Sequence, residues 1–373
     1  MAGIYIHIPF CRQACHYCDF HFSTNLSRMD QLVSAIGQEI ELRKDYLHGQ
    51  TVETVYFGGG TPSLLSEKHL NYILDKIRRK FTSDWKEVTL EANPDDLSDE
   101  NLKVWKNLGI DRLSLGIQSF QEEVLQFYNR AHSAKEALEA ISRGRDAGFE
   151  KFSIDLIYGF PYLDHSIWRK DLTEALSQDP GHISAYSLTV EPKTALGKWT
   201  EKGQFQPADE DFVAEQFEWL QEQSENAGYI QYEISNFGKP GQFALHNTNY
   251  WKGVSYLGLG PSAHSFDGKN RGFNPSSNSG YIKSLESGKL PFEIETSTIE
   301  DQANDRILTG LRTIWGLSPS DLSAEFGIDL IKRKALEIEK LENQGWLVWD
   351  GKILSLTKRG MLLADSIAAE LFI

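Results

Sequence analysis

The sequence predicts an α/β protein built on a partial barrel of six β/α units and followed by a mostly helical, winged-helix-like C-terminal domain. Up to about residue 190, short β-rich runs alternate with longer amphipathic stretches, as in a parallel sheet with crossover helices. The short runs are apolar nearly throughout, as strands buried on both faces are. From about residue 300 onward, helical patterns surround two short β-rich runs.

The predicted strands and helices of the barrel follow one another in alternation. The strands are 4–8, 54–57, 87–91, 112–117, 152–157 and 183–188. The helices are 29–44, 67–81, 101–106, 134–147 and 166–177. Because the carboxyl ends of parallel strands gather at one end of such a fold, we expect the functional site among the residues that directly follow each strand.

All three cysteines follow the first strand, at Cys11, Cys15 and Cys18. Three thiolates on one loop can hold three irons of a [4Fe-4S] cluster and leave the fourth iron open to an outside ligand. A disulfide framework would need an even number of cysteines in a short secreted chain. A structural zinc site would need a fourth ligand, which a histidine such as His7 or His16 would supply. The residue types and their spacing favour the cluster over zinc.

The later strands also end in residues suited to ligand binding. The second ends in Gly-Gly-Gly-Thr-Pro at 58–62, where the backbone can approach a ligand closely. Three further strand ends carry Glu91, Gln118 and Asp155. Each feature alone is more typical of a loop or a helix cap, but their register with successive strands indicates one site.

Composition excludes some classes of partner. The formal net charge of the 373-residue chain is −15, which disfavours nucleic acid or an anionic membrane as the main partner. The winged-helix-like tail holds 9 Lys and Arg against 12 Asp and Glu, so it is expected to serve packing or protein docking. No apolar run reaches the length of a membrane span, and the N-terminus lacks the pattern of a signal peptide. A cytoplasmic location is expected.

The stretch 191–300 has a different character. It holds a predicted helix at 209–225, then a run rich in glycine, asparagine and aromatic residues that contains His-Asn-Thr-Asn-Tyr-Trp at 246–251. A histidine beside two large aromatics is more often a packed residue than a ligand, although imidazole is a common axial ligand of haem. The Gly-Leu-Gly-Pro run at 258–261 predicts a turn rather than a phosphate-binding loop.

These motifs together carry a family resemblance. Cys-x3-Cys-x2-Cys after an apolar strand resembles the radical S-adenosylmethionine (SAM) family that contains oxygen-independent coproporphyrinogen III dehydrogenase. His-Asn-x-x-Tyr-Trp at 246–251 is similar to a motif of the haem chaperone branch of that family. The resemblance covers nearly the whole chain. It implies a radical SAM partial (β/α)6 barrel at 1–190, a linking region with the His-Asn-x-x-Tyr-Trp motif at 191–300 and a winged-helix-like domain at 301–373.

The resemblance also implies a role for each matching residue. The [4Fe-4S] cluster would be bound by Cys11, Cys15 and Cys18. SAM would be bound by Tyr5, Gly59, Gly60, Thr61, Glu91, Gln118, Arg130 and Asp155. Haem would be bound by His246, Tyr250 and Trp251.

Two departures separate the chain from the dehydrogenase. Asp19-Phe20 stands where that enzyme has Gly-Cys after the third cysteine, and the chain starts at the first strand without the enzyme's N-terminal extension. With the His246 motif, these departures favour a haem chaperone that binds haem and transfers it to an acceptor, with no catalytic residue assigned. The alternative is the dehydrogenase itself, which decarboxylates coproporphyrinogen III oxidatively. A nucleic-acid-modifying radical enzyme is disfavoured by the acidic tail.

The chaperone interpretation also implies partners. The expected partners are haem and acceptor haem proteins of a respiratory, membrane-associated type, with a peripheral position at the membrane during transfer. No nucleic acid is expected, and homodimerisation is left open.

Overall fold

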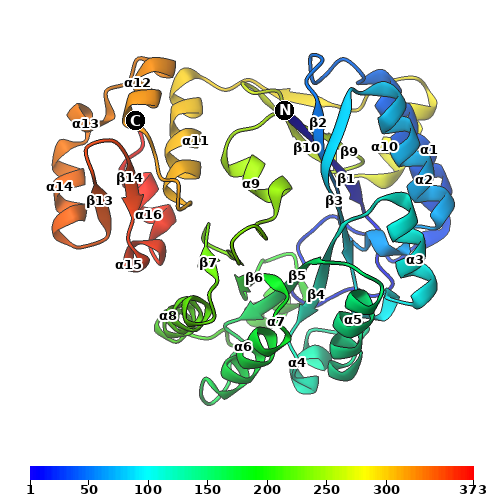
Figure 1. The fold of residues 1–373 in the computed structure, drawn as a ribbon, viewed down its shortest axis with the longest axis horizontal. Coiled ribbons are helices and arrows are strands. Elements are labelled where there is room, and N and C mark those ends of the chain that lie inside the picture. The colour runs from blue at the N-terminus through cyan, green and yellow to red at the C-terminus, as the bar shows by residue number, and fades with distance from the viewer.

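The computed structural model describes all 373 residues, and a curved twelve-stranded sheet forms its centre (Figure 1). Six neighbouring strands run parallel and lie in the order of the sequence. They are β1 (Ala2–Ile8), β2 (Val52–Gly59), β3 (Ser83–Ala92), β4 (Arg112–Gln118), β5 (Lys151–Tyr158) and β6 (Gly181–Ser187). All six strands predicted from the sequence are therefore present, and the parallel arrangement is confirmed.

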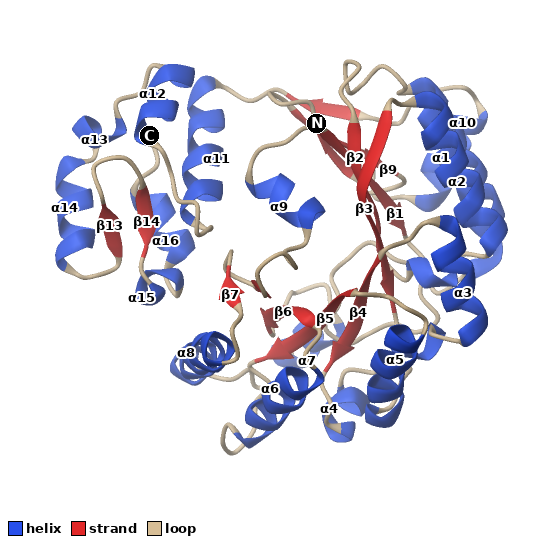
Figure 2. Ribbon diagram, viewed as in Figure 1, coloured by secondary structure: helices blue, strands red, loops and turns tan.

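Helices cover the outer face of this sheet (Figure 2). They are α1 (Met29–Leu42), α2 (Glu67–Lys80), α3 (Asp99–Leu108), α4 (Glu122–Phe127), α5 (Ala134–Asp146) and α6 (Ser166–Gln178). Ser66, Ser98 and Ser133 cap α2, α3 and α5, each accepting a hydrogen bond from a backbone N–H three residues later. The five predicted helices are confirmed. The sequence did not predict α4, because six residues are too few to display a helical period.

Short strands extend the sheet at both edges. On the β1 side lie β9 (Tyr256–Leu259), β10 (His264–Phe266), β11 (Arg271–Phe273) and β12 (Glu293–Glu295). On the β6 side lie β8 (Asn236–Gly238) and β7 (Ile230–Gln231). The sequence did not predict these strands, because two to four residues carry no readable alternation. The turn predicted at 258–261 is confirmed only in its second half, because Gly258 and Leu259 belong to β9 and the chain turns at Gly260, which has a φ of +96°.

Four helices accompany these strands. They are α7 (Ala195–Glu201), α8 (Glu210–Asn226), α9 (Leu245–Trp251) and α10 (Asn278–Glu286). The predicted helix at 209–225 corresponds to α8. In Figure 1, α9 lies between the inner face of the sheet and the helices that follow in the C-terminal part of the chain.

The C-terminal part forms a separate, mostly helical lobe (Figure 1). Its helices are α11 (Ile299–Leu311), α12 (Pro319–Phe326), α13 (Leu330–Arg333), α14 (Ala335–Asn343), α15 (Lys358–Met361) and α16 (Ala364–Glu370). Its hairpin joins β13 (Leu347–Trp349) to β14 (Leu354–Leu356). The mostly helical, winged-helix-like domain is confirmed, whereas the boundaries at 190 and 300 stay a prediction. None of the helices combines the length and apolar character that crossing a bilayer requires.

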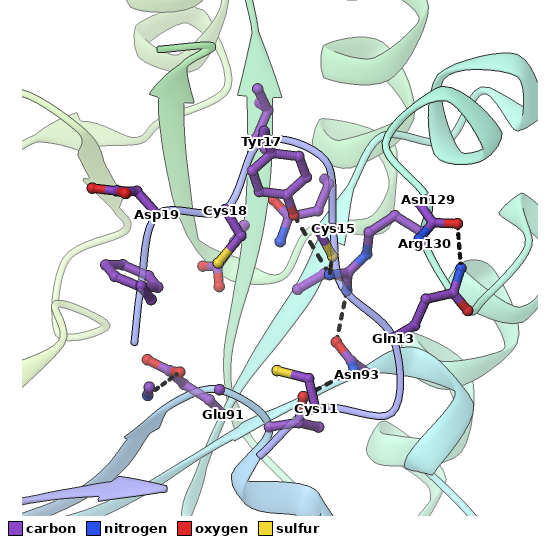
Figure 3. Close-up of a pocket in the computed structure, with 18 of the residues that line it drawn as sticks. Cys11, Gln13, Cys15, Tyr17, Cys18, Asp19, Glu91, Asn93, Asn129 and Arg130 are labelled. Carbon is purple, nitrogen blue, oxygen red and sulfur yellow. Dashed lines mark hydrogen bonds between the residues drawn. The ribbon is translucent and has the colours of Figure 1, made fainter. Parts of the chain in front are cut away.

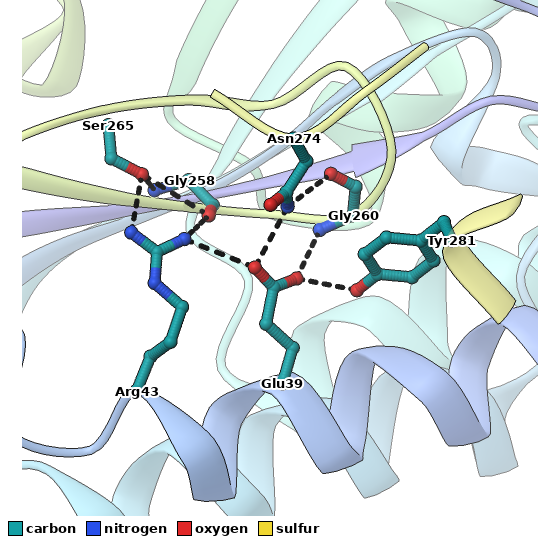
Figure 4. Close-up of polar contacts among 7 residues, drawn as sticks. All are labelled: Glu39, Arg43, Gly258, Gly260, Ser265, Asn274 and Tyr281. Carbon is teal, nitrogen blue, oxygen red and sulfur yellow. Dashed lines mark hydrogen bonds and ion pairs between the residues drawn. The ribbon is translucent and has the colours of Figure 1, made fainter. Parts of the chain in front are cut away.

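A buried ion pair fastens the added strands to α1 (Figure 4). The Glu39 carboxylate lies 3.1 Å from Nη1 of Arg43 and accepts hydrogen bonds from the Gly260 N–H at 2.9 Å and the Tyr281 hydroxyl at 2.5 Å. Arg43 also donates to the Gly258 carbonyl oxygen at 2.9 Å. Both charged side chains are almost fully buried. Since Gly258 belongs to β9, this pair fixes the strand that flanks β1.

Removing one partner of this pair should destabilise the protein strongly. We expect Glu39→Ala to lower the free energy of unfolding by about 3–5 kcal/mol, because it leaves the Arg43 charge buried and unpaired. Urea titration of both proteins measures this difference. The control is Asp75→Ala, which breaks the exposed pair with Arg79 on α2 and should cost only about 0–1 kcal/mol. Equal effects of the two substitutions would contradict the structural role of Glu39.

Candidate functional site

A cavity of about 510 Å³, here named the cysteine cavity, lies at the carboxyl ends of β1 to β6 (Figure 3). All three cysteines line it, together with seven of the eight residues predicted to contact SAM. These seven are Gly59, Gly60, Thr61, Glu91, Gln118, Arg130 and Asp155. Residues that lie up to about 140 positions apart in the sequence therefore share one cavity because they end parallel strands. Its volume is within the range of cofactor sites.

Arg130 attaches the cysteine loop (residues 11–18) to the sheet. One terminal nitrogen, Nη1, lies 3.3 Å from Sγ of Cys15. The other, Nη2, donates to Oδ1 of Asn93 at 2.6 Å and to the Gly116 carbonyl oxygen at 2.7 Å (Figure 3). A planar guanidinium offers several donors in a fixed fork, so one side chain links the loop to the ends of β3 and β4.

The glycine turn after β2 is shaped by close backbone contacts. A Cβ atom on Gly60 would lie 2.7 Å from the Phe10 carbonyl oxygen and 2.8 Å from that of Ile8. Gly59 has a φ of +106°, which side chains rarely tolerate, and its N–H donates to Glu91 at 3.1 Å. Glycine is thus required for the turn to sit against the start of the cysteine loop.

Two carboxyl groups face the cysteine cavity with raised pKa values. Burial raises the pKa of Glu91 to about 7, although the Tyr56 hydroxyl donates to it at 2.7 Å. Burial likewise raises the pKa of Asp155 to about 6, against the stabilising hydroxyl of Ser114. A desolvated carboxyl pair of this kind is stabilised in its ionised form by a cationic ligand. The site therefore suits a ligand that carries positive charge.

Tyr5 is the one predicted SAM-contacting residue that does not line the cysteine cavity. Its hydroxyl lies 3.2 Å from Nδ1 of His7, and its ring stacks on Tyr56 with a centroid separation of 5.9 Å. Both burial and the nearby charge of Glu91 raise its pKa. Tyr5 therefore lies deeper in the barrel than the cavity lining and reaches the cavity only through its contacts with His7 and Tyr56.

The structure does not support the zinc alternative. No three or more His, Cys, Asp or Glu side chains are arranged to hold a single metal ion, as a tetrahedral zinc site requires. Both ring nitrogens of His7 are engaged, Nδ1 with Tyr5 and Nε2 with the His21 carbonyl oxygen at 3.0 Å. Nδ1 of His16 lies 2.7 Å from the carbonyl oxygen of Phe127.

Three soft sulfur donors around one cavity instead fit a multi-iron cluster. Burial raises the pKa of the Cys18 thiol to about 11 and also raises that of Cys11. Loading of metal must therefore release protons from these thiols.

A carboxylate on the sheet fixes the start of α9. The Glu87 carboxylate, on β3, accepts hydrogen bonds from the backbone N–H groups of Leu245 and His246, at 3.1 and 3.0 Å. The first N–H groups of a helix lack partners within it, and a carboxylate satisfies them well. Glu87 is itself paired with the buried Arg112 at 3.6 Å. The position of α9 is therefore fixed by a strand far away in the sequence.

His246 lies against the inner face of β2 and is 2% exposed. Its Nδ1 lies 2.8 Å from Oγ1 of Thr54, and its Nε2 lies 2.7 Å from the hydroxyl of Tyr250. Its ring stacks on Tyr56 with a centroid separation of 5.0 Å. Burial lowers its pKa to about 3, so the imidazole is neutral. With both nitrogens engaged, His246 anchors α9 in this conformation.

A second cavity, here named the α9–α11 cavity, has a volume of about 590 Å³. It lies between α9 and the first helices of the C-terminal lobe, with lining residues on α9, α11 and α12. Of the three residues predicted to bind haem, Tyr250 and Trp251 line this cavity and His246 does not. Tyr250 thus separates His246 from the cavity.

Sequence reasoning missed several residues that shape both cavities. Tyr56 contacts Glu91 and His246, and Asn93 lines the cysteine cavity. Glu87 was visible only as an acidic residue in a strand otherwise buried on both faces. Their roles depend on contacts between distant elements, which a single sequence does not display.

The chain is similar to two family models. The Radical SAM superfamily model matches residues 5–172. The HemN C-terminal domain model matches residues 298–363. The first match spans the strands that end in the cysteine cavity up to β5, and the second lies in the C-terminal lobe.

Curated relatives extend this similarity over the whole chain. The haem chaperone HemW of Bacillus subtilis is 36% identical over 376 residues, which cover 98% of each chain. HemW of Mycobacterium tuberculosis is 34% identical, covering 99% of this chain and 94% of the relative. Among solved structures, coproporphyrinogen III oxidase (HemN) from Escherichia coli matches with a TM-score of 0.86 at 21% identity, covering 100% of this chain and 90% of that one. That match confirms the fold.

Proposed function

Because the chain belongs to the HemW family, whose curated members are haem chaperones, we propose that it binds haem and passes it to an acceptor haem protein. We also propose that it carries a [4Fe-4S] cluster with bound SAM. The observation that carries the second part is the convergence of three cysteines and seven of the eight residues predicted to contact SAM on one cavity. The first part rests on the family and on the aromatic residues of α9 beside a second cavity.

The residues of the cysteine cavity suit a cluster and SAM. Cys11, Cys15 and Cys18 are the proposed cluster ligands, and Nη1 of Arg130 contacts Sγ of Cys15. The turn at Gly59 and Gly60 exposes backbone groups where the amino-acid part of SAM would lie, and Thr61 follows it. A cluster with bound SAM supplies one-electron chemistry.

The carboxyl groups would hold the cationic and hydroxyl parts of the cofactor. Glu91 and Asp155 would accept hydrogen bonds from an ammonium group or from ribose hydroxyls, and Gln118 offers an amide at the same rim. Tyr5 would stay behind Glu91 and support it from inside the barrel. We assign no catalytic role to any of these residues.

We propose that haem binds beside α9, with His246 as an axial ligand and Tyr250 and Trp251 as aromatic surface. In the observed conformation the Tyr250 hydroxyl occupies Nε2 of His246. Iron ligation therefore requires the Tyr250 side chain to move aside. The low pKa of His246 agrees with this role, since a neutral imidazole keeps a lone pair free for iron without losing a proton.

The proposed acceptor is a membrane-associated haem protein of respiratory type, met by a cytoplasmic chaperone that approaches the membrane during transfer. The acidic C-terminal lobe is the proposed docking surface for protein partners, and homodimerisation is left to measurement. We propose domain boundaries at residues 190 and 300, which separate the six-stranded barrel from the α9 region and the C-terminal lobe.

SAM binding should weaken as pH falls. The pKa of Glu91 is about 7 in the free protein, so below that pH a cationic ligand must displace a proton before it pairs with the carboxylate. We expect affinity to be about tenfold lower at pH 6 than at pH 8. Anaerobic calorimetry of the cluster-loaded protein measures the affinity for SAM at each pH. Glu91→Gln should bind SAM more weakly at pH 8 and with a flatter pH dependence; equal wild-type affinities at the two pH values would refute the role of Glu91.

A haem titration followed by absorbance tests the function itself. Loss of an axial ligand in His246→Ala should weaken binding roughly 10- to 100-fold. Tyr250→Phe removes the hydroxyl that occupies Nε2, so it should bind haem at least as tightly as wild type if His246 is the ligand. The matched control is His48→Ala, at an exposed position after α1. If His246→Ala binds haem like wild type while Tyr250→Phe binds more weakly, the iron ligand is Tyr250 instead.

The alternative function is the dehydrogenase reaction, since all three cysteines and seven of the eight residues proposed to bind SAM line the cysteine cavity. We expect no dehydrogenase activity, since Asp19 and Phe20 replace Gly-Cys after the third cysteine. The test is anaerobic incubation of the loaded protein with coproporphyrinogen III, SAM and a reductant. Stoichiometric formation of protoporphyrinogen, with SAM consumed in proportion, would overturn the chaperone assignment.

A further inference from the structure

The α9–α11 cavity combines aromatic side chains with basic ones. One wall is aromatic and consists of Tyr250, Trp251, Tyr256 and Phe266. The basic lining residues are Lys269, Arg271, Arg306 and Arg312, and the acidic ones are Glu233, Asp305 and Glu325. Four cations around one cavity stand out in a chain whose net charge is −15. Such a combination suits a ligand that is flat and apolar over most of its area and carries negative charge at an edge.

The aromatic wall is continuous. The rings of Tyr250 and Tyr256 meet edge to face with centroids 4.5 Å apart, and Tyr256 lies 6.4 Å from the ring of Phe266. The guanidinium of Arg312 lies 5.3 Å from the ring of Trp251. A wall of this kind offers stacking and edge contacts to a large planar ring system.

Two of the cations line the cavity from different elements, Arg271 from β11 and Arg306 from α11. Arg271, on β11, pairs with Asp305 at 2.9 Å, and the next residue of α11 is Arg306. Arg306 pairs with Glu325 at 3.3 Å and covers Gly253, just after α9. The side chains of both arginines are 39–48% exposed, so these ion pairs contribute little and exchange readily.

Each arginine keeps donors for a further carboxylate. Arg271 uses only Nη2 in its ion pair, and Arg306 uses Nη2 for Glu325 and makes only a long 3.5 Å contact from Nη1 to the Lys252 carbonyl oxygen. A guanidinium has five N–H donors and binds carboxylates through two of them. In the cysteine cavity, by contrast, Arg130 already donates to Asn93 and Gly116 and contacts Cys15.

We propose that the α9–α11 cavity recognises haem by its two propionates, which pair with Arg271 and Arg306 while the macrocycle lies against the aromatic wall. This inference rests on the proposed haem binding and adds the residues that select the carboxylate edge. It makes α11 part of the haem site, so the site is incomplete without the C-terminal lobe. It holds for either iron ligand, because both arginines lie apart from His246.

The test compares two ligands on one set of variants by absorbance titration. Haem has two free carboxylates, and haem dimethyl ester has the same ring and iron without them. We expect wild type to bind haem at least about tenfold more tightly than the ester. The double variant Arg271→Gln/Arg306→Gln should lose at least about tenfold in haem affinity and bind both ligands equally. Arg271→Lys/Arg306→Lys should restore part of the preference, since the charge returns without the planar fork.

Controls separate the possible failures. Arg79→Gln, at an exposed ion pair on α2, should leave both affinities unchanged, and thermal unfolding shows whether each variant is folded. If wild type binds neither ligand, the proposed function and this inference fail together. If wild type binds haem and His246→Ala weakens it, but the ester or the double variant binds as tightly as haem to wild type, this inference alone is overturned.

Discussion

The packing of Tyr56 is the interaction on which both cavities depend. Its hydroxyl donates to Glu91 at 2.7 Å, which holds that carboxyl group at the rim of the cysteine cavity. Its ring lies between Tyr5 and His246, with centroid separations of 5.9 and 5.0 Å. The parallel register of β1 and β2 pairs Tyr5 with Tyr56, so this stack follows directly from the sheet. One side chain therefore supports both Glu91, which lines the cysteine cavity, and His246 on α9.

Polar groups around this stack are satisfied by one another. Glu87 accepts the first N–H groups of α9, Thr54 lies against Nδ1 of His246, and Tyr250 lies against Nε2. A buried network of this kind is costly to disturb, because any group that loses its partner stays desolvated. On the other edge of β1, Glu39 pairs with Arg43, and Arg43 donates a hydrogen bond to the Gly258 carbonyl oxygen of β9. The strand that leads into the cysteine loop is therefore fixed from both sides.

Features that depend on local sequence could be predicted, and features that depend on contacts between distant parts of the chain could not. The six barrel strands and the cysteine loop were predictable because each has its own local signal, an apolar run or a short spacing of thiols. The strands from β7 to β12 depend on pairing with neighbouring strands, β9 with β1, β8 with β6 and the others with one another, and their own residues carry no such signal. Tyr5 lies behind the cysteine cavity rather than in its lining. The sequence could not show this, because it does not reveal how deep in the barrel each residue of a strand lies. The burial of His246 depends on Thr54, 192 residues away, so motif matching alone did not reveal it.

The two cavities adjoin, which suggests a reason for a haem chaperone to retain the cysteine cavity: binding in one cavity can affect binding in the other. Tyr186, at the end of β6, lines both of them, and Tyr56 connects Glu91 of one to the α9 segment of the other. A ligand that shifts a shared wall changes the free energy of binding at the neighbouring site, and such coupling acts equally in both directions. A cofactor in the cysteine cavity would thereby adjust how firmly α9 and Tyr250 are held, without being consumed. On the proposed assignment, the three cysteines would hold the cofactor, and the residues that α9 presents to the second cavity would determine which ligand the cofactor assists.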